Sequence, residues 1–380
     1  MNAPSMRQAT RRLLARRPKR LLLSLGSGLV ATAALAGTVG AAPASASLRV
    51  THHSAVQLTE DGSSLLYPLY QAWAAGYGKS HPGFSSTSGA DGSGTGIADA
   101  ENGTTNFGAS DAYLPPGTYR QYPTIENIPM AISAQMINYN VPGLNKDKLK
   151  LNGPVLAQMY EGKIRNWDAK AIRRLNPGVK LPNLRVVPIH RSDSSGDSFL
   201  FSSYLAFSDH GSFAGRQGPS TLPSFPAVEG ELAATGNSGM VAACAGAKGC
   251  VAYIGVSYHQ DIANDHLGMA LLENRSGRFE PPYLKQIEAE AASFPRVPAN
   301  GSISLIYGPA KNGYPIINYE YIVVRKNQPS AGLAATMRAF LSWCINPKHG
   351  NSTAYLDKVR FKPLPAAAER VASKLISKIR

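Results

Sequence analysis

Residues 186–199 read VVPIHRSDSSGDSF, a stretch that joins an apolar run to the start of a helix. The run at 186–189 predicts a buried strand, and the apolar pattern from Phe199 to Phe207 predicts a helix. Arg191 follows the strand, where its planar guanidinium can bind an oxyanion. Residues Ser195 to Asp197 open the helix, whose unpaired first N–H groups attract an anion. The stretch therefore predicts half of an anion site.

A second segment, residues 61–70, reads DGSSLLYPLY and places small hydroxyl residues before an amphipathic run. We predict a helix from Leu65 to Gly76, with Ser64 as the cap of its first turn. Its N-terminal amides could also attract an anion. Capping serines are common, however, so this segment alone does not indicate a binding site.

Two more segments have a similar character. Residues 90–97 read ADGSGTGI, in which glycines allow a close approach of the backbone to a ligand and Ser93 supplies a hydroxyl. Residues 106–111 read NFGASD, a strand-like run that ends in Asp111. The first segment could equally be a flexible surface loop, and the aspartate could be a turn former.

The chain as a whole has the pattern of an α/β protein. Strand-like runs such as Tyr321–Val324 alternate with helical patterns such as Leu333–Trp343. A chain of 380 residues exceeds what one ordinary core needs, so we expect two domains. The sequence has no internal repeat and no long low-complexity linker, which places the domain boundaries in short crossings.

Residues 1–46 are interpreted as an export signal. Seven basic and no acidic residues precede an apolar run from Leu21 to about Ala42, and Ala44 to Ala46 form an A-x-A cleavage site. A retained membrane anchor and the twin-arginine route are alternatives. No cysteine lies near the cleavage site, so a lipid anchor has no attachment point. We expect an exported protein, extracellular or associated with the cell envelope.

Removal of the leader lowers the formal charge from +15 to +8, because it carries seven of the positive charges. The remaining charge is spread out, with no dense basic block, and nucleic-acid binding is therefore disfavoured. A mildly basic surface would suit an anionic ligand or an anionic envelope, but it is also ordinary surface charge.

Three cysteines remain in a chain expected to be exported. Cys244 and Cys250 bracket a short flexible turn and are expected to form a disulfide in an oxidising compartment. Cys344 lies in an apolar helical stretch and is interpreted as a buried free thiol. The histidines are scattered and no zinc-like ligand spacing occurs, so we expect neither a metal site nor a cofactor.

Taken together, these segments resemble the phosphate-binding proteins of ABC uptake systems, in particular those of actinobacteria. The resemblance covers nearly the whole mature chain and extends to further segments in the same order: 160–168, 176–178, 236–239, 313–316 and 363–365. It implies a type II periplasmic-binding-protein fold with two α/β lobes joined by two crossings. The first lobe would comprise residues 47–133 and 310–380, and the second residues 134–309.

The same resemblance implies the ligand, inorganic phosphate, and the residues that hold it. The first lobe would contribute Ser64, Leu65 through its backbone, Ser93 and Asp111, and the second lobe Arg191, Ser195, Gly196 and Asp197. An ionised Asp111 cannot donate, so it would repel sulfate and accept the P–OH proton of phosphate. ABC permease subunits are the implied partners, and we expect a monomer.

Two positions depart from the family pattern. Many relatives have an aromatic residue in place of Leu65, which matters little if only its N–H is used. The familiar pattern has threonine in place of Asp197, and this second carboxylate puts the hydrogen-bond scheme in doubt. Asp197 could face the ligand as a second proton acceptor, or it could cap its helix or pair with Arg191.

A secreted enzyme and an untethered scavenger are the alternatives to a binding protein that catalyses nothing and serves a transporter. A secreted phosphatase would need a metal cluster or a supported nucleophile, and neither is evident. A serine hydrolase could use Ser192 or Ser195 beside His190, but no G-x-S-x-G elbow surrounds them. An untethered phosphate scavenger or adhesin remains the closest alternative, since it would keep the fold without serving a transporter.

Overall fold

The computed structural model describes residues 57–146 and 148–380, in which strands and helices alternate along the chain. The predicted α/β class is confirmed. The export signal predicted for residues 1–46 lies outside the described residues.

The strands are short except for β4, which is continuous over fifteen residues. Their bounds are β1 (Gln57–Gly62), β2 (Ser85–Ser88), β3 (Phe107–Ser110), β4 (Ile125–Tyr139), β5 (Lys150–Leu151), β6 (Val187–Arg191), β7 (Leu232–Ala234), β8 (Cys250–Gly255), β9 (Gly268–Met269), β10 (Leu271–Glu273), β11 (Phe279–Glu280) and β12 (Ile317–Arg325).

The helices fall mostly between these strands. Their bounds are α1 (Tyr67–Ser80), α2 (Ser93–Asn102), α3 (Pro116–Gln121), α4 (Gly153–Tyr160), α5 (Lys170–Leu175), α6 (Gly196–Ser208), α7 (Phe213–Gln217), α8 (Gly236–Gly246), α9 (His259–Asn264), α10 (Leu284–Ala292), α11 (Ala331–Ile345), α12 (Thr353–Leu356) and α13 (Ala366–Ile376), with short 3₁₀ turns at Val256–Tyr258 and Asp357–Val359.

Strand β4 connects two groups of strands in the main sheet, whose order is β2-β1-β3-β12-β4-β8-β6-β7. Its first part, Ile125 to Ala134, pairs antiparallel with β12, and its last part, Gln135 to Tyr139, pairs antiparallel with β8. Strands β1, β2 and β3 are parallel to one another on one side, as are β6, β7 and β8 on the other. All fifteen β4 side chains are buried, as expected for a strand covered on both faces.

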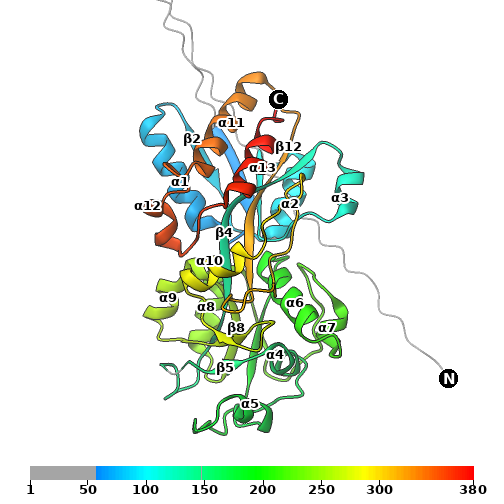
Figure 1. The fold of residues 1–380 in the computed structure, drawn as a ribbon, viewed down its shortest axis with the longest axis vertical. Coiled ribbons are helices and arrows are strands. Elements are labelled where there is room, and N and C mark those ends of the chain that lie inside the picture. Colours follow the sequence, from blue (N-terminus) through cyan, green and yellow to red (C-terminus); the bar gives the residue numbers. More distant parts are fainter. Residues whose placement is uncertain (1–56, 147) are drawn as a thin grey trace, which may run out of the picture. The chain divides into compact units, whose positions relative to one another are not determined.

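The helices divide in the same way as the strands. Helix α1 packs on β2, α2 on β1 and β3, and α13 on β4 and α11, whereas α6 and α8 pack on β8 and α4 packs on α6 (Figure 1). In parallel sheets of this kind the loops after the strands meet at one edge of the sheet, which is where binding residues gather. The loops after β1, β2, β3 and β6 carry the four segments singled out in the sequence.

Several predicted elements are found close to their predicted bounds. The run predicted at 186–189 overlaps β6, which begins one residue later at Val187, while Tyr321–Val324 lies in β12 and Leu333–Trp343 in α11. The helix predicted from Leu65 begins two residues later, at Tyr67.

The cap expected at Ser64 is wrong. Leu66 donates its N–H to Ser63 Oγ over 2.9 Å, so Ser63 makes this contact before α1. Ser64 instead turns its hydroxyl toward the N-terminus of α8, where Asn237 donates to it. Ser63 and Ser64 are each less than 3% exposed, so each buried hydroxyl needs a hydrogen-bond partner of its own. This is why the two serines turn toward different helices.

The two cysteine predictions are confirmed. Cys244 and Cys250 form a disulfide with their Cα atoms 5.4 Å apart, linking the end of α8 to the start of β8. Cys344 is a buried free thiol on α11. Burial raises the pKa of this thiol well above its usual value, which keeps it protonated and unreactive.

Candidate functional site

The four segments singled out in the sequence meet at one place. Gly94, at the start of α2, donates its N–H to Ser194 O over 2.8 Å, which joins the loop before α2 to the loop before α6. A Cβ atom added at Gly196 would lie 2.3 Å from both Asp111 Oδ2 and Ser93 Oγ. Only glycine permits this approach.

Asp111 lies directly after β3 and is 2% exposed. Ser63 donates its hydroxyl to Asp111 Oδ1, and Ser93 Oγ lies 3.4 Å from Oδ2. The Ser93 hydroxyl oxygen also accepts the N–H of Asp111 over 3.1 Å. These contacts fix the carboxylate at the junction of β3 with the first turn of α2.

Arg191 lies at the end of β6 with its side chain completely buried. Its Nε donates to Asp193 Oδ1 over 2.7 Å, its Nη2 donates to Asp193 Oδ2, and its Nη1 donates to Asp197 Oδ2 over 2.8 Å. Three of the five N–H groups of the guanidinium are thereby used, and one remains on each terminal nitrogen for another acceptor. Asp197 thus adopts the alternative in which it pairs with Arg191.

Asn237, the second residue of α8, links the segment 61–70 to the segment 186–199. Its side-chain amide donates to Ser64 Oγ over 2.9 Å and to Asp197 Oδ2 over 2.6 Å. Its carbonyl oxygen accepts the N–H of Gly255 over 2.7 Å. Asn237 is 0% exposed and its side chain is satisfied on both sides.

Helix N-termini supply further donors at this place. Ser195 is the cap of α6 and accepts the N–H of Ser198, as the sequence predicts. Within residues 57–146 and 148–380, the backbone N–H groups of Leu65, Gly196 and Asp197 have no protein acceptor. First-turn amides of this kind carry a partial positive charge and hold anions without a full counter-charge.

Burial and neighbouring charge set the protonation of the acidic residues. Burial, and then the charge of Asp197, raise the pKa of Asp111 to about 7, while hydrogen bonds from Glu320 and Ser63 and the charge of Arg191 lower it. Burial raises the pKa of Asp197, and the charge of Arg191 opposes that shift. Burial alone would lower the pKa of Arg191, but its two carboxylate partners raise it overall. The arrangement can therefore surround a compact oxyanion with donors and offer one carboxylate acceptor.

The arrangement expected of a serine hydrolase is not found near His190. The ring nitrogen Nδ1 of His190 lies 3.3 Å from Arg191 O, Ser192 Oγ lies 2.9 Å from Thr235 Oγ1, and Ser195 Oγ serves as the α6 cap. In the described part of the chain, no group of three or more His, Cys, Asp or Glu residues is placed to hold a metal ion. Over the same residues, no helix is both long and apolar enough to cross a bilayer.

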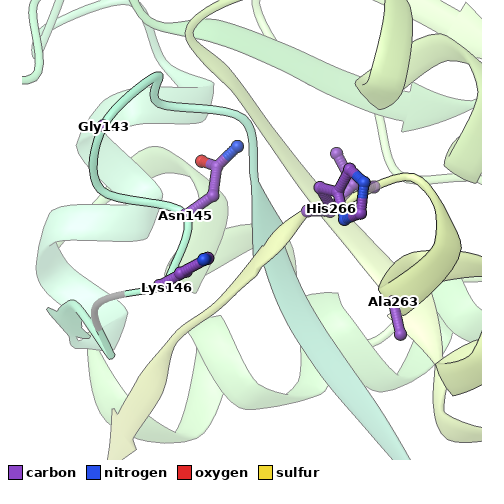
Figure 2. A pocket seen from close by; sticks show the side chains of 6 residues that line it. Gly143, Asn145, Lys146, Ala263 and His266 are labelled. Atoms are coloured by element: carbon purple, nitrogen blue, oxygen red, sulfur yellow. The ribbon is translucent and has the colours of Figure 1, made fainter.

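A separate pocket of about 500 Å³ lies between the loop after β4 and the end of α9 (Figure 2). Gly143, Asn145 and Lys146 line one side, and Ala263 and His266 line the other. The Asn145 carbonyl oxygen accepts the N–H of Val141 within its own loop, over 2.7 Å. The residues that line this pocket include none of the eight expected site residues.

The sequence of the chain matches the model of a known family. A family model described as a PBP superfamily domain matches residues 49–348. The chain belongs to the PBP superfamily. Among the relatives of this superfamily member, the phosphate-binding protein PstS of Methanocaldococcus jannaschii is 29% identical over 309 residues, covering 74% of this chain and 78% of that protein. The phosphate-binding protein PstS 2 of Mycobacterium tuberculosis is 28% identical, covering 81% and 83%.

A solved structure of the same fold is known. The crystal structure of a phosphate-binding protein from Stenotrophomonas maltophilia matches with a TM-score of 0.64 and 19% identity, covering 84% of this chain and 94% of that one. The expected type II periplasmic-binding-protein fold is confirmed, and so is the resemblance to phosphate-binding proteins.

The structure brings all eight expected site residues to one cluster. Three further residues, Asp193, Asn237 and Gln135, contact this cluster and were not predicted from the sequence. Asp193 lies two residues beyond Arg191, a spacing that could have suggested it as the partner of the guanidinium. Asn237 belongs to a segment noted only for its resemblance to the family. Gln135 donates to Asp197 O over 2.7 Å from the middle of β4, and no local signal identifies it.

Replacing Asn237 by alanine should destabilise the protein by about 2–4 kcal/mol, measured by urea unfolding. The change removes the amide that serves the buried Asp197 carboxylate and Ser64 hydroxyl, and it leaves the Gly255 N–H without an acceptor. The control is Ser238→Ala, because the neighbouring Ser238 is exposed; this change should alter the free energy of unfolding by less than about 0.5 kcal/mol. Equal stability of the two variants would show that the Asn237 network contributes nothing.

Proposed function

We propose that the chain is an exported binding protein that encloses one inorganic phosphate ion at this cluster and delivers it to an ABC importer. The named phosphate-binding relatives support the ligand, since they cover most of this chain and most of their own length. The protein would bind and release phosphate without transforming it. Permease subunits are the proposed partners, and the leader at residues 1–46 is the proposed export signal.

The observation that carries this proposal is a single carboxylate acceptor placed among donors in a buried site. Asp111 is 2% exposed and faces Ser93 and the N-terminus of α6. Phosphate near neutral pH carries at least one proton and can donate it to an ionised carboxylate, whereas sulfate has none to donate. Asp111 therefore repels sulfate and accepts phosphate, which gives the site its selectivity.

The charge balance of the cluster also suits an oxyanion held by dipoles. The charge of Arg191 is already offset by Asp193 and Asp197, so the site carries no net positive charge for the ligand. The two remaining guanidinium N–H groups and the amides of Leu65 and Gly196 would then bind phosphate oxygens directly. Burying an anion is tolerated only when nearly every oxygen accepts a hydrogen bond, and this set provides such donors.

We further propose that the cluster lies between two lobes, residues 47–133 with 310–380 and residues 134–309. The pairing of β4 supports this division, because its partner changes from β12 to β8 between Ala134 and Gln135. Ser64, Leu65, Ser93 and Asp111 then belong to the first lobe. Contacts between the lobes include Asn237 with Ser64 and Ser257 Oγ with Leu65 O, the latter over 2.8 Å.

Purified protein stripped of ligand should bind phosphate and not sulfate in titration calorimetry. Arg191→Ala should weaken phosphate binding by about 2–5 kcal/mol, because it removes the oxyanion donors and leaves the buried Asp197 and the partly buried Asp193 without their cation. The control is Arg185→Ala, since Arg185 is exposed and, among residues 57–146 and 148–380, forms its ion pair with the exposed Glu229.

Two outcomes would contradict this assignment. Equal affinity of the unmodified protein for sulfate and phosphate would remove the role of Asp111 as a selective acceptor. A loss of less than about tenfold in Arg191→Ala, which is roughly 1.4 kcal/mol, would place the phosphate elsewhere.

Saturating phosphate should make the protein more compact in small-angle scattering, because the two proposed lobes close around the ligand. The radius of gyration should fall on phosphate addition and stay unchanged on sulfate addition. Arg191→Ala, measured at the same phosphate concentration, should not become more compact. Scattering profiles of the unmodified protein that coincide with and without phosphate would refute the hinge.

A further inference from the structure

Glu320 is a buried carboxylic acid beside the proposed site, and the sequence reasoning gave it no role. It lies on β12 and is 0% exposed. Strand β12 pairs antiparallel with β3, with Tyr321 opposite Ser110. The next position along this register places Glu320 opposite Asp111, and side chains of such cross-strand pairs lie on the same face of the sheet.

The two oxygens of Glu320 have different surroundings. Oε1 accepts from the Ser133 hydroxyl and from Asn318 Nδ2, the latter over 3.1 Å. Oε2 is buried, and no donor among the described residues reaches it. The strand register sets the Glu320 carboxyl group opposite that of Asp111, and each group shifts the pKa of the other: Glu320 lowers the pKa of Asp111, and Asp111 raises the pKa of Glu320. Since an ionised Asp111 has no proton to give, the proton between the two groups must come from Oε2.

The surroundings decide which of the two acids keeps the proton. Asp111 receives the hydroxyl of Ser63 and the charge of Arg191, both of which favour its ionised form. Glu320 has no cation beside it among the described residues. Burial, and then the charge of Asp111, raise the pKa of Glu320 well above its usual value. Two facing carboxyls therefore share one proton, and it resides on Glu320.

We propose that Glu320 is a protonated positioning residue, which donates from Oε2 to the Asp111 carboxylate and holds it ionised as the acceptor for the proton of the bound anion. This inference rests on the proposed phosphate function. It assigns Glu320 to the selectivity of the site, although the residue does not itself touch the ligand.

The role follows from the charges that face Asp111. Burial and then the charge of Asp197 oppose ionisation of Asp111, while the neighbouring Glu320 and then the charge of Arg191 favour it. If the Glu320 donor is lost, Asp111 keeps its proton to a higher pH. A protonated Asp111 is itself a donor, and it no longer excludes an anion without a proton such as sulfate. With Glu320 as donor, the site selects an anion that can give a proton to Asp111; without it, the site would also admit anions that have no proton.

The test compares Glu320→Met, which cannot donate, with Glu320→Gln, whose amide can donate to Asp111 while its carbonyl accepts from Ser133 and Asn318. Phosphate and sulfate affinities are measured by calorimetry at about pH 7.5 and about pH 9, both above the pKa of about 7 at which Asp111 ionises in the unmodified protein. In Glu320→Met, the preference for phosphate over sulfate should fall at least about tenfold at the lower pH and recover in part at the higher pH. Glu320→Gln should retain most of that preference at both.

Glu60→Met is the matched control, since Glu60 is another buried acid of the same sheet and lies on β1, where no residue of the described chain is a hydrogen-bond partner of either carboxyl oxygen. Its preference for phosphate should equal that of the unmodified protein. Unchanged selectivity in Glu320→Met, or an equal loss in Glu320→Gln, would overturn the proposal. If the unmodified protein binds no phosphate, both the proposed function and the role of Glu320 in selectivity fail.

A second measurement does not depend on phosphate or on the folding of Glu320→Met. Infrared difference spectra at neutral pH between the unmodified protein and Glu320→Gln should show the loss of one C=O stretching band of a protonated carboxyl group. If the difference shows instead the loss of an ionised carboxylate, Glu320 does not hold the proton, and the proposal is wrong even where phosphate binds.

Discussion

The burial of the Arg191 guanidinium with Asp197 is the interaction on which the site depends. Both side chains are completely buried, so neither charge is tolerated without the other. The pair in turn requires Asp193 on the guanidinium and Asn237 on the carboxylate. These partners come from the loop after β6 and from α8, and the ion pair therefore fixes how those elements meet.

The sheet explains how distant segments reach this place. Strand β4 pairs with both β12 and β8. Because β12 also pairs with β3, and β8 with β6, strand β4 connects the two parts of the sheet whose loops carry Asp111 and Arg191. Backbone donors then approach from the starts of α2 and α6, with Gly196 allowing contact near Asp111. The same register places Glu320 opposite Asp111, where it can govern the protonation of Asp111 without contacting a ligand.

The sequence predicted the parts of the site that are local in the chain. Arg191 at the end of a strand and Ser195 at the start of a helix are signals of this kind, and both are found as expected. For residues 90–97 the sequence left two alternatives, a glycine-rich segment that approaches a ligand and a flexible surface loop, and in the structure α2 begins within them at Ser93. Contacts across the fold had no local signal: Asn237 is 173 positions from Ser64, and the pairing of Glu320 with Asp111 depends on strand register.

The central claim is that phosphate lies between Asp111 and Arg191, and a high-resolution crystal structure of the phosphate complex tests it most directly. The account predicts one phosphate oxygen within about 2.5–2.7 Å of an Asp111 carboxylate oxygen, as expected for a proton shared with an anion. Other oxygens should lie within about 3.2 Å of the guanidinium and of the Leu65 and Gly196 amides. Phosphate bound away from Asp111, or contacting it only through a cation, would contradict the account.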